Sequence, residues 1–163
     1  MNITRGIIAL ALFGATLVSV ANADTEPVLS ELKAFEVVSD EEGNENFSPA
    51  ERVDPGAVIE YQLTYTNTSD ESLSRFVVNG RIPQASEYLM HSADVGQKSI
   101  FEARTDDIEW SIPPLRRMVA DEAGILRPET VPPKEYAGIR WRLNSPLAAG
   151  EEVVARYRVR VDR

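Results

Sequence analysis

Two segments of the chain alternate strictly between apolar and polar side chains, and this period of two limits the fold more than any other feature. The first segment, 58–67, carries Ile59, Tyr61, Leu63 and Tyr65 on one parity and Glu60, Gln62, Thr64 and Thr66 on the other. The second segment, 153–161, repeats this design. Alternation over about eight residues between turn formers is typical of a β-strand with one buried and one exposed face. Both segments are therefore predicted to be strands.

Further short strands are predicted at six places along the chain. They are residues 29–38, 73–82, 87–92, 99–103, 107–112 and 136–143. Turn-forming residues separate them at intervals of about ten residues, and helical periodicity is nearly absent. This spacing predicts one all-β domain over residues 24–163, folded as a two-sheet antiparallel sandwich of about seven strands.

The segment 113–135 differs from the rest of the chain. It contains five prolines and no clean period, with a turn signal near Asp121–Gly124. We interpret it as a long proline-rich loop or a protruding hairpin. A helix over 115–123 is the alternative, since no residue there would break one.

The first 23 residues have the pattern of a Sec-type signal peptide. Arg5 gives a short positive region, residues 7–20 are apolar, and Ala21-Asn22-Ala23 fits the small-x-small cleavage rule. Cleavage is predicted between Ala23 and Asp24. An uncleaved membrane anchor is the alternative, because the apolar stretch is barely long enough to span a bilayer. The expected location of the mature chain is the periplasm or the extracellular space.

The mature chain, 24–163, is acidic and has no cysteine. Loss of Arg5 changes the formal net charge from −9 to −10. This charge argues against nucleic acid and anionic membranes as partners. The fold is expected to form without disulfides, and no second apolar stretch is long enough to cross a membrane.

Several short motifs resemble the "conserved repeat" domain of bacterial surface and exported proteins. These are Pro55-Gly56, Tyr61, Thr64–Asn67, Val77-Val78, Ile82-Pro83, Tyr88 with Ser92, Tyr136–Trp141, and Leu147–Gly150 before 153–161. Together they cover roughly residues 52–161. The resemblance implies an immunoglobulin-like β-sandwich, usually without enzymatic activity, that serves as a stalk, spacer or adhesion module. The chain holds one copy, which favours a free periplasmic or secreted protein.

No catalytic or cofactor signature accompanies this pattern, and the chain is predicted not to be an enzyme. His91 is the only histidine, so a Ser-His-Asp triad and a zinc site both lack their usual residues. The acidic stretch 39–46 is interpreted as a solvated turn, with a weak Ca²⁺ site as the alternative, because its spacing differs from that of an EF-hand. No cofactor or metal is expected.

Charge is distributed unevenly along the chain. Residues 24–60 carry eleven acidic residues against two basic ones, whereas 136–163 carry six arginines against three acidic residues. If the last two strands pair, one sheet face would carry Arg140, Arg142, Arg156, Arg158 and Arg160. One interpretation is an outward ladder neutralised by the acidic N-terminal strand. The alternative is a patch that binds an acidic protein or an anionic glycan.

The predicted function is a structural or protein-interaction role in the bacterial envelope, with a partner that is an envelope or extracellular protein. The oligomeric state stays open. Two alternatives are a carbohydrate- or ligand-binding module, which requires exposed aromatic rings, and a chaperone-like sandwich, which requires an unpaired apolar edge strand. Trp110 and Trp141 share parity with aliphatic neighbours and are therefore predicted to lie in the core.

Overall fold

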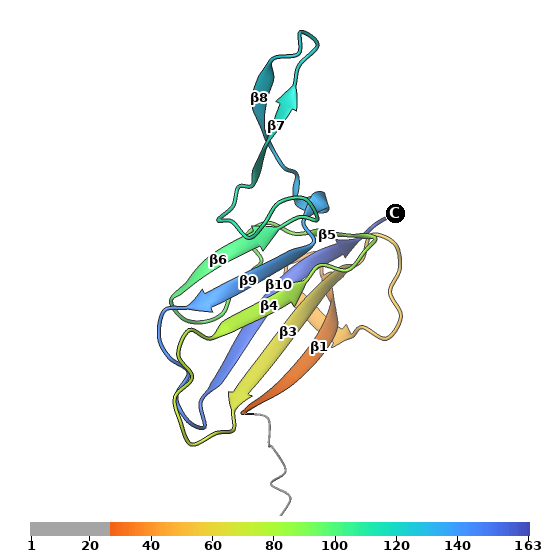
Figure 1. Cartoon of the computed structure of the whole chain (residues 1–163). Helices are drawn as coiled ribbons and strands as arrows, with labels where there is room; N and C mark the ends of the chain where they lie inside the picture. Colours follow the sequence, from red (N-terminus) through yellow and green to blue (C-terminus); the bar gives the residue numbers. More distant parts are fainter. Residues whose placement is uncertain (1–26) are drawn as a thin grey trace, which may run out of the picture.

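The computed structural model describes residues 27–163 (Figure 1). The strands are β1 (Val28–Ser39), β2 (Glu45–Pro49), β3 (Val58–Asn67), β4 (Val77–Arg81), β5 (Ser86–Tyr88), β6 (Ser99–Arg104), β7 (Arg116–Ala120), β8 (Leu126–Thr130), β9 (Gly138–Leu143) and β10 (Glu152–Val161). A short 3-10 helix, η1 (Pro133–Glu135), precedes β9. The predicted signal peptide and its cleavage site lie outside the described residues.

The strands form an all-β sandwich, as predicted. A five-stranded sheet has the order β2-β1-β3-β10-β5, and a three-stranded sheet has the order β4-β9-β6. The hairpin β7-β8 forms a third, separate sheet, and every strand pairing is antiparallel. The sandwich therefore has eight strands in two layers, close to the predicted number.

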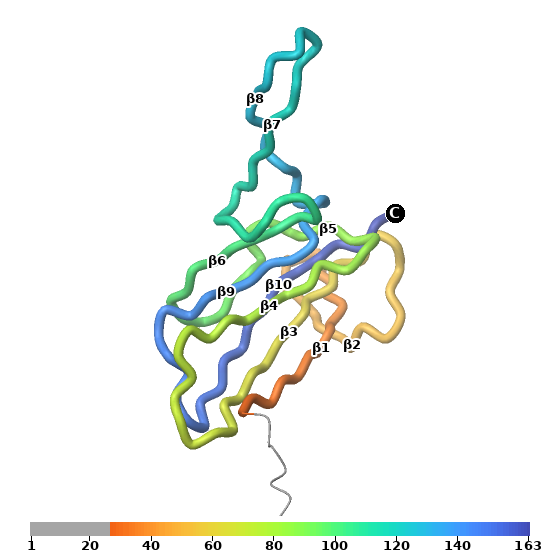
Figure 2. The backbone as a smooth tube through the Cα atoms, viewed as in Figure 1, coloured from red at the N-terminus to blue at the C-terminus, as the bar shows by residue number. Residues whose placement is uncertain are grey.

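The alternating segment 58–67 is the central strand of the larger sheet. β3 pairs with β1 on one side and with β10 on the other, so N-terminal and C-terminal strands meet across it (Figure 2). Its apolar parity packs on the core, because Ile59 is buried and Tyr61 stacks on Tyr157 of β10 at 5.2 Å between ring centroids. The polar parity faces outward, as predicted.

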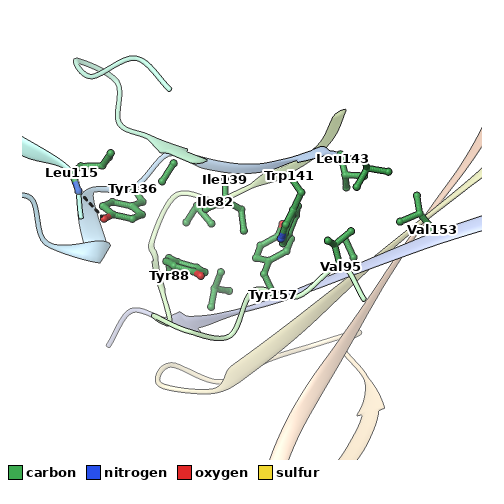
Figure 3. Packing of buried hydrophobic residues seen from close by; sticks show 14 of the residues in the cluster. Ile82, Tyr88, Val95, Leu115, Tyr136, Ile139, Trp141, Leu143, Val153 and Tyr157 are labelled. Atoms are coloured by element: carbon green, nitrogen blue, oxygen red, sulfur yellow. Dashed lines mark hydrogen bonds between the residues drawn. The ribbon is translucent and has the colours of Figure 1, made fainter. Parts of the chain in front are cut away.

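Trp141 lies at the centre of the core (Figure 3). Its ring contacts Phe101 of β6 and Tyr157 of β10, at centroid distances of 5.8 and 6.3 Å. The Tyr157 hydroxyl reaches past the core and donates to the carbonyl of Arg81 at 2.6 Å. Burial raises the pKa of Tyr157, so the hydroxyl keeps its proton. The predicted core position of Trp141 is confirmed.

Trp110 is not a member of the core cluster, and the predicted strand 107–112 is wrong. Thr105 Oγ1 accepts hydrogen bonds from the N–H groups of Asp107 and Ile108, so the chain turns where a strand was expected. One bridge, from Ser111 to Ala103, pairs this segment with β6. Trp110 is half-buried and Ile112 is 68% exposed.

Asn67, the last residue of β3, is fully buried and joins three chain segments. Its side-chain nitrogen lies 2.7 Å from the carbonyl oxygen of Glu71 and 3.0 Å from those of Leu147 and Ala148. Its side-chain oxygen accepts from the N–H and the hydroxyl of Ser69. The sequence suggested only that this asparagine ends a strand. It does end β3, and its side chain also fixes the turns at one end of the sandwich.

Candidate interaction surface

The five predicted arginines do not share one surface. β9, which carries Arg140 and Arg142, belongs to the three-stranded sheet, whereas β10, with the other three, belongs to the five-stranded sheet. Inward positions of both strands are buried, so the arginines point outward on opposite faces of the sandwich. The condition for a single arginine face, pairing of the last two strands, is not met, because β10 pairs with β3 and β5.

Arg158 is neutralised within the fold. Its Nε lies 2.8 Å from Glu60 of β3, and its two terminal nitrogens lie 2.6 and 2.7 Å from the carboxylate of Glu45 at the start of β2. Glu60 is only 6% exposed and also accepts from Gln62 at 2.9 Å. The hydrogen bond from Arg158 lowers the pKa of Glu45, and the two glutamates raise that of Arg158. This arginine therefore joins β10 to the acidic N-terminal strands.

Arg140 and Arg142 form a matching arrangement on the other face. Their Nε atoms lie 2.7 and 3.2 Å from Glu102 of β6, which is 7% exposed. The ring of Trp110 covers Arg140, with the guanidinium carbon 4.5 Å from the ring centroid, and Arg104 lies 5.5 Å from the same ring. Trp110 thus shields an ion pair instead of filling the core.

Arg156 and Arg160 are different, because both are exposed and neither forms an ion pair with any residue of 27–163. They stand on either side of the Arg158 cluster on the outer face of β10. Of the predicted arginines, these two keep their charge available for a partner.

The segment 113–135 forms a hairpin that projects well beyond both sheets (Figure 1). β7 and β8 pair from Arg116 opposite Thr130 to Ala120 opposite Leu126. Every residue from Met118 to Thr130 is exposed except Asp121, which is partly buried. The helix considered for 115–123 does not form, because β7 occupies its place.

The two faces of this hairpin differ in chemistry. One face carries two ion pairs, Arg117 with Glu129 at 2.8 Å and Arg127 with Asp121 at 2.7 Å, together with Val119, which pairs in register with Arg127 and is 38% exposed. Cross-strand register places the opposite parity on the other face, which we call the apolar hairpin face: Met118, Ala120, Leu126 and Pro128. Met118 is 58% exposed and Leu126 is 61% exposed. Arg116, the next residue of this parity, stands at its base without an ion pair to any described residue.

The base of the hairpin is held firmly by the core. Leu115 and Val131 are both fully buried, and the Val131 N–H donates to the Leu115 carbonyl at 2.9 Å. The Leu115 N–H lies 3.5 Å from the Tyr136 hydroxyl (Figure 3). Arg117 also bonds Glu135 of η1. The hairpin is therefore anchored to the core at its base.

The structure also places the two remaining candidates from the sequence, His91 and the acidic stretch 39–46. His91 is exposed in a turn after β5, where its backbone φ is +64°, and is not part of a strand. In the acidic stretch 39–46, the Asp40 carboxylate accepts the N–H groups of Glu42 and Asn44 and the side chain of Asn44, which lowers the Asp40 pKa. Within residues 27–163 no three His, Cys, Asp or Glu side chains gather as a metal site.

No protein-family model, curated protein or solved structure matches this chain. In the described part of the chain, no helix has the length and hydropathy needed to cross a membrane.

Proposed function

We propose that the chain is a non-enzymatic, exported β-sandwich module of the bacterial envelope that binds a partner protein through the apolar hairpin face. The observation that carries this proposal is the exposed strip of Met118, Ala120, Leu126 and Pro128 on a projecting hairpin whose ion pairs lie on the opposite face. The signal-peptide pattern and the resemblance to the conserved repeat domain support export and a role in binding.

The energetics of the hairpin support this function. An isolated two-stranded hairpin has little stability in water, and exposed apolar area costs roughly 25 cal/mol per Å² relative to its burial. Here the buried base anchors the hairpin, and the backbone ladder of β7 and β8 defines its two faces. Its other face keeps Met118 and Leu126 in solvent. Clustered, exposed apolar side chains on an anchored projection are typical of protein-binding sites.

The chemistry of the face also limits the partner. The hairpin presents a flat apolar strip with Arg116 at its base, and the rest of the mature chain is strongly acidic. The complementary surface is a shallow apolar groove with a carboxylate at one rim. Such a groove belongs to a protein and not to a nucleic acid or an anionic lipid surface.

Affinity capture with matched variants tests this function. The mature chain 24–163 is immobilised through an N-terminal tag and exposed to envelope extract, and captured proteins are quantified by mass spectrometry. The variant Met118→Ser/Leu126→Ser is expected to lose the enriched partner. The control Leu29→Ser/Val38→Ser, which removes exposed apolar side chains from β1, is expected to keep it.

A second variant pair addresses the arginines. If Arg156 and Arg160 also bind an acidic surface of the partner, Arg156→Ser/Arg160→Ser is expected to reduce the amount of partner captured. Identical captured sets for the wild type and for Met118→Ser/Leu126→Ser would overturn the hairpin proposal.

A further inference from the structure

The two sheets of the sandwich differ in width, and the larger one is uncovered on one side. Gly80 of β4 lies directly over Tyr157 of β10, since a Cβ atom at Gly80 would fall 2.9 Å from the tyrosine ring. β4 is an edge of its sheet, whereas β3, β1 and β2 extend beyond β10 in the other layer. The inner face of β1 therefore has no strand of residues 27–163 above it (Figure 1).

The uncovered face is apolar. Leu32 of β1 pairs in register with Leu63 of β3, which in turn pairs with the buried Ala155, so both leucines point toward the interior side of the sheet. Leu32 is nevertheless 59% exposed. Together with Tyr61, these leucines line a groove of about 540 Å³ whose opposite wall includes Asn79 and Arg81 of β4.

The wall of this groove carries backbone groups that no strand of residues 27–163 pairs. Residues 76 and 82 hydrogen-bond toward β9, through Leu143 N–H to the Phe76 carbonyl and Ile82 N–H to the Ala137 carbonyl. Antiparallel ladders alternate, so Val77, Asn79 and Arg81 direct their N–H and C=O groups away from β9. The Arg81 carbonyl accepts the Tyr157 hydroxyl. No strand within 27–163 pairs with this edge of β4.

The geometry selects the kind of occupant. A strand added to β4 would lie about 4.8 Å from it and about 10 Å above the larger sheet, which places it over Leu32 and Leu63. A second sandwich could not pair there edge to edge, because β1 and β2 extend under the groove and would collide with its larger sheet. The groove admits one extended segment. Arg81 is the one charged residue among those that line it in the described part of the chain.

We infer that the free edge of β4 accepts one extended peptide segment of a partner protein by strand addition. Backbone hydrogen bonds form with Val77 and Asn79. Apolar side chains at alternate positions of the segment cover Leu32 and Leu63, and an acidic group lies beside Arg81. This site is separate from the apolar hairpin face, so either proposal can fail without the other.

The probe is a phage-displayed library of linear peptides selected on the mature chain 24–163. Enriched peptides are expected to alternate apolar and polar residues and to contain an acidic residue. Hydrogen exchange is expected to slow at the amides of Val77 and Asn79 when a synthetic copy of the best peptide binds. Failure to enrich such peptides, or protection elsewhere in the chain, would overturn the inference.

Two variants with matched controls localise the binding. Asn79→Pro removes one outward N–H that β9 does not use, and Asn79→Thr keeps it. Leu32→Lys charges the groove floor, whereas Leu29→Lys charges the opposite face of β1 at a site of similar exposure, 63%. Asn79→Pro and Leu32→Lys are each expected to lower the affinity for the peptide about tenfold or more. The controls Asn79→Thr and Leu29→Lys are expected to leave this affinity unchanged.

The melting temperature shows whether Asn79→Pro and Leu32→Lys fold. If one of them fails to fold, the other is enough to test the site. Equal affinity for Leu32→Lys and Leu29→Lys would overturn the inference. So would a dimer of the mature chain that protects the same two amides without peptide, because the occupant would then be a second copy. Met118→Ser/Leu126→Ser, which alters the hairpin, is expected to bind the peptide normally.

Discussion

Glu60 and Glu102 lie on the outer faces of two different sheets, and each is covered by arginine. Glu60 bonds Arg158 and Glu102 bonds Arg140, with Phe47 and Trp110 packed over the respective guanidinium groups. A nearly buried carboxylate that loses its arginine keeps an uncompensated charge, so each pair holds neighbouring strands together. At the scale of single residues, most of the predicted arginine patch stabilises the sandwich.

The strongest effect on stability at this scale is predicted for Asn67. Asn67→Ala leaves the carbonyls of Leu147 and Ala148 without their side-chain donor inside the protein. The expected loss is about 3 kcal/mol in the free energy of unfolding, measured by urea denaturation. The control Asn79→Ala, at an exposed position, is expected to change it by less than about 0.5 kcal/mol. Equal effects of the two substitutions would contradict the role assigned to Asn67.

Glu45 makes the free energy of unfolding depend on pH in the acidic range. Its folded pKa lies below the ordinary value of 4.5, because Arg158 donates hydrogen bonds to the ionised carboxylate. Its stabilisation is therefore complete above pH about 4.5 and is lost as the pH falls through the lower folded-state pKa. Glu45→Gln is expected to be less stable than the wild type at pH 6 and to approach it near pH 3, in denaturant titrations at each pH. A pH-independent difference would contradict this assignment.

The β7-β8 hairpin forms a separate two-stranded sheet that projects from the sandwich (Figure 1). Its strands pair only with each other, and its base is fixed where the Val131 N–H meets the Leu115 carbonyl. Since the residues beyond this point are exposed, the hairpin contributes little to the stability of the body. It is an addition to a sandwich that is complete without it.

Excision of the hairpin tests its independence. Residues 117–129 are replaced by Asn-Gly, a dipeptide suited to a two-residue hairpin turn between Arg116 and Thr130. The shortened chain is expected to melt within a few degrees of the wild type, because the buried Leu115 and Val131 remain. Unfolding of the shortened chain would show that the hairpin belongs to the core fold.

The strands that could be predicted from the sequence are those whose two faces differ in polarity. β3 and β10 each have one face in the core and a polar face turned outward, so their side chains alternate in polarity, although no residue of β3 is fully exposed. β2 was missed, because all of its residues are exposed and its sequence resembles a loop. The segment 107–112 has strand-like alternation, but the Thr105 hydroxyl bends it into a turn.

The candidate surface was only partly predictable. A protruding hairpin was one of the interpretations of 113–135, but its apolar face depends on the register between two five-residue strands, one of which contains Pro128. The pairing of β10 with β3 joins residues nearly a hundred positions apart. No local pattern encodes that choice, which separates the arginines onto two faces.

At the scale of the whole molecule, two separate surfaces remain available on one sandwich. The apolar hairpin face projects from one end, and the described chain begins at β1 near the opposite end (Figure 1). The groove beside β4 lies along the body. Because the hairpin points away from residue 27, a partner bound there would not meet the start of the described chain.

The most direct test of the hairpin as a binding element is photo-crosslinking in living cells from two adjacent positions. A photoreactive amino acid is placed at Leu126, on the apolar hairpin face, or at Arg127, on the charged face, and both side chains are more than half exposed. We predict one dominant adduct with a partner protein from position 126 and none from position 127. Adducts of equal yield from both positions, or none from position 126, would contradict the proposed function.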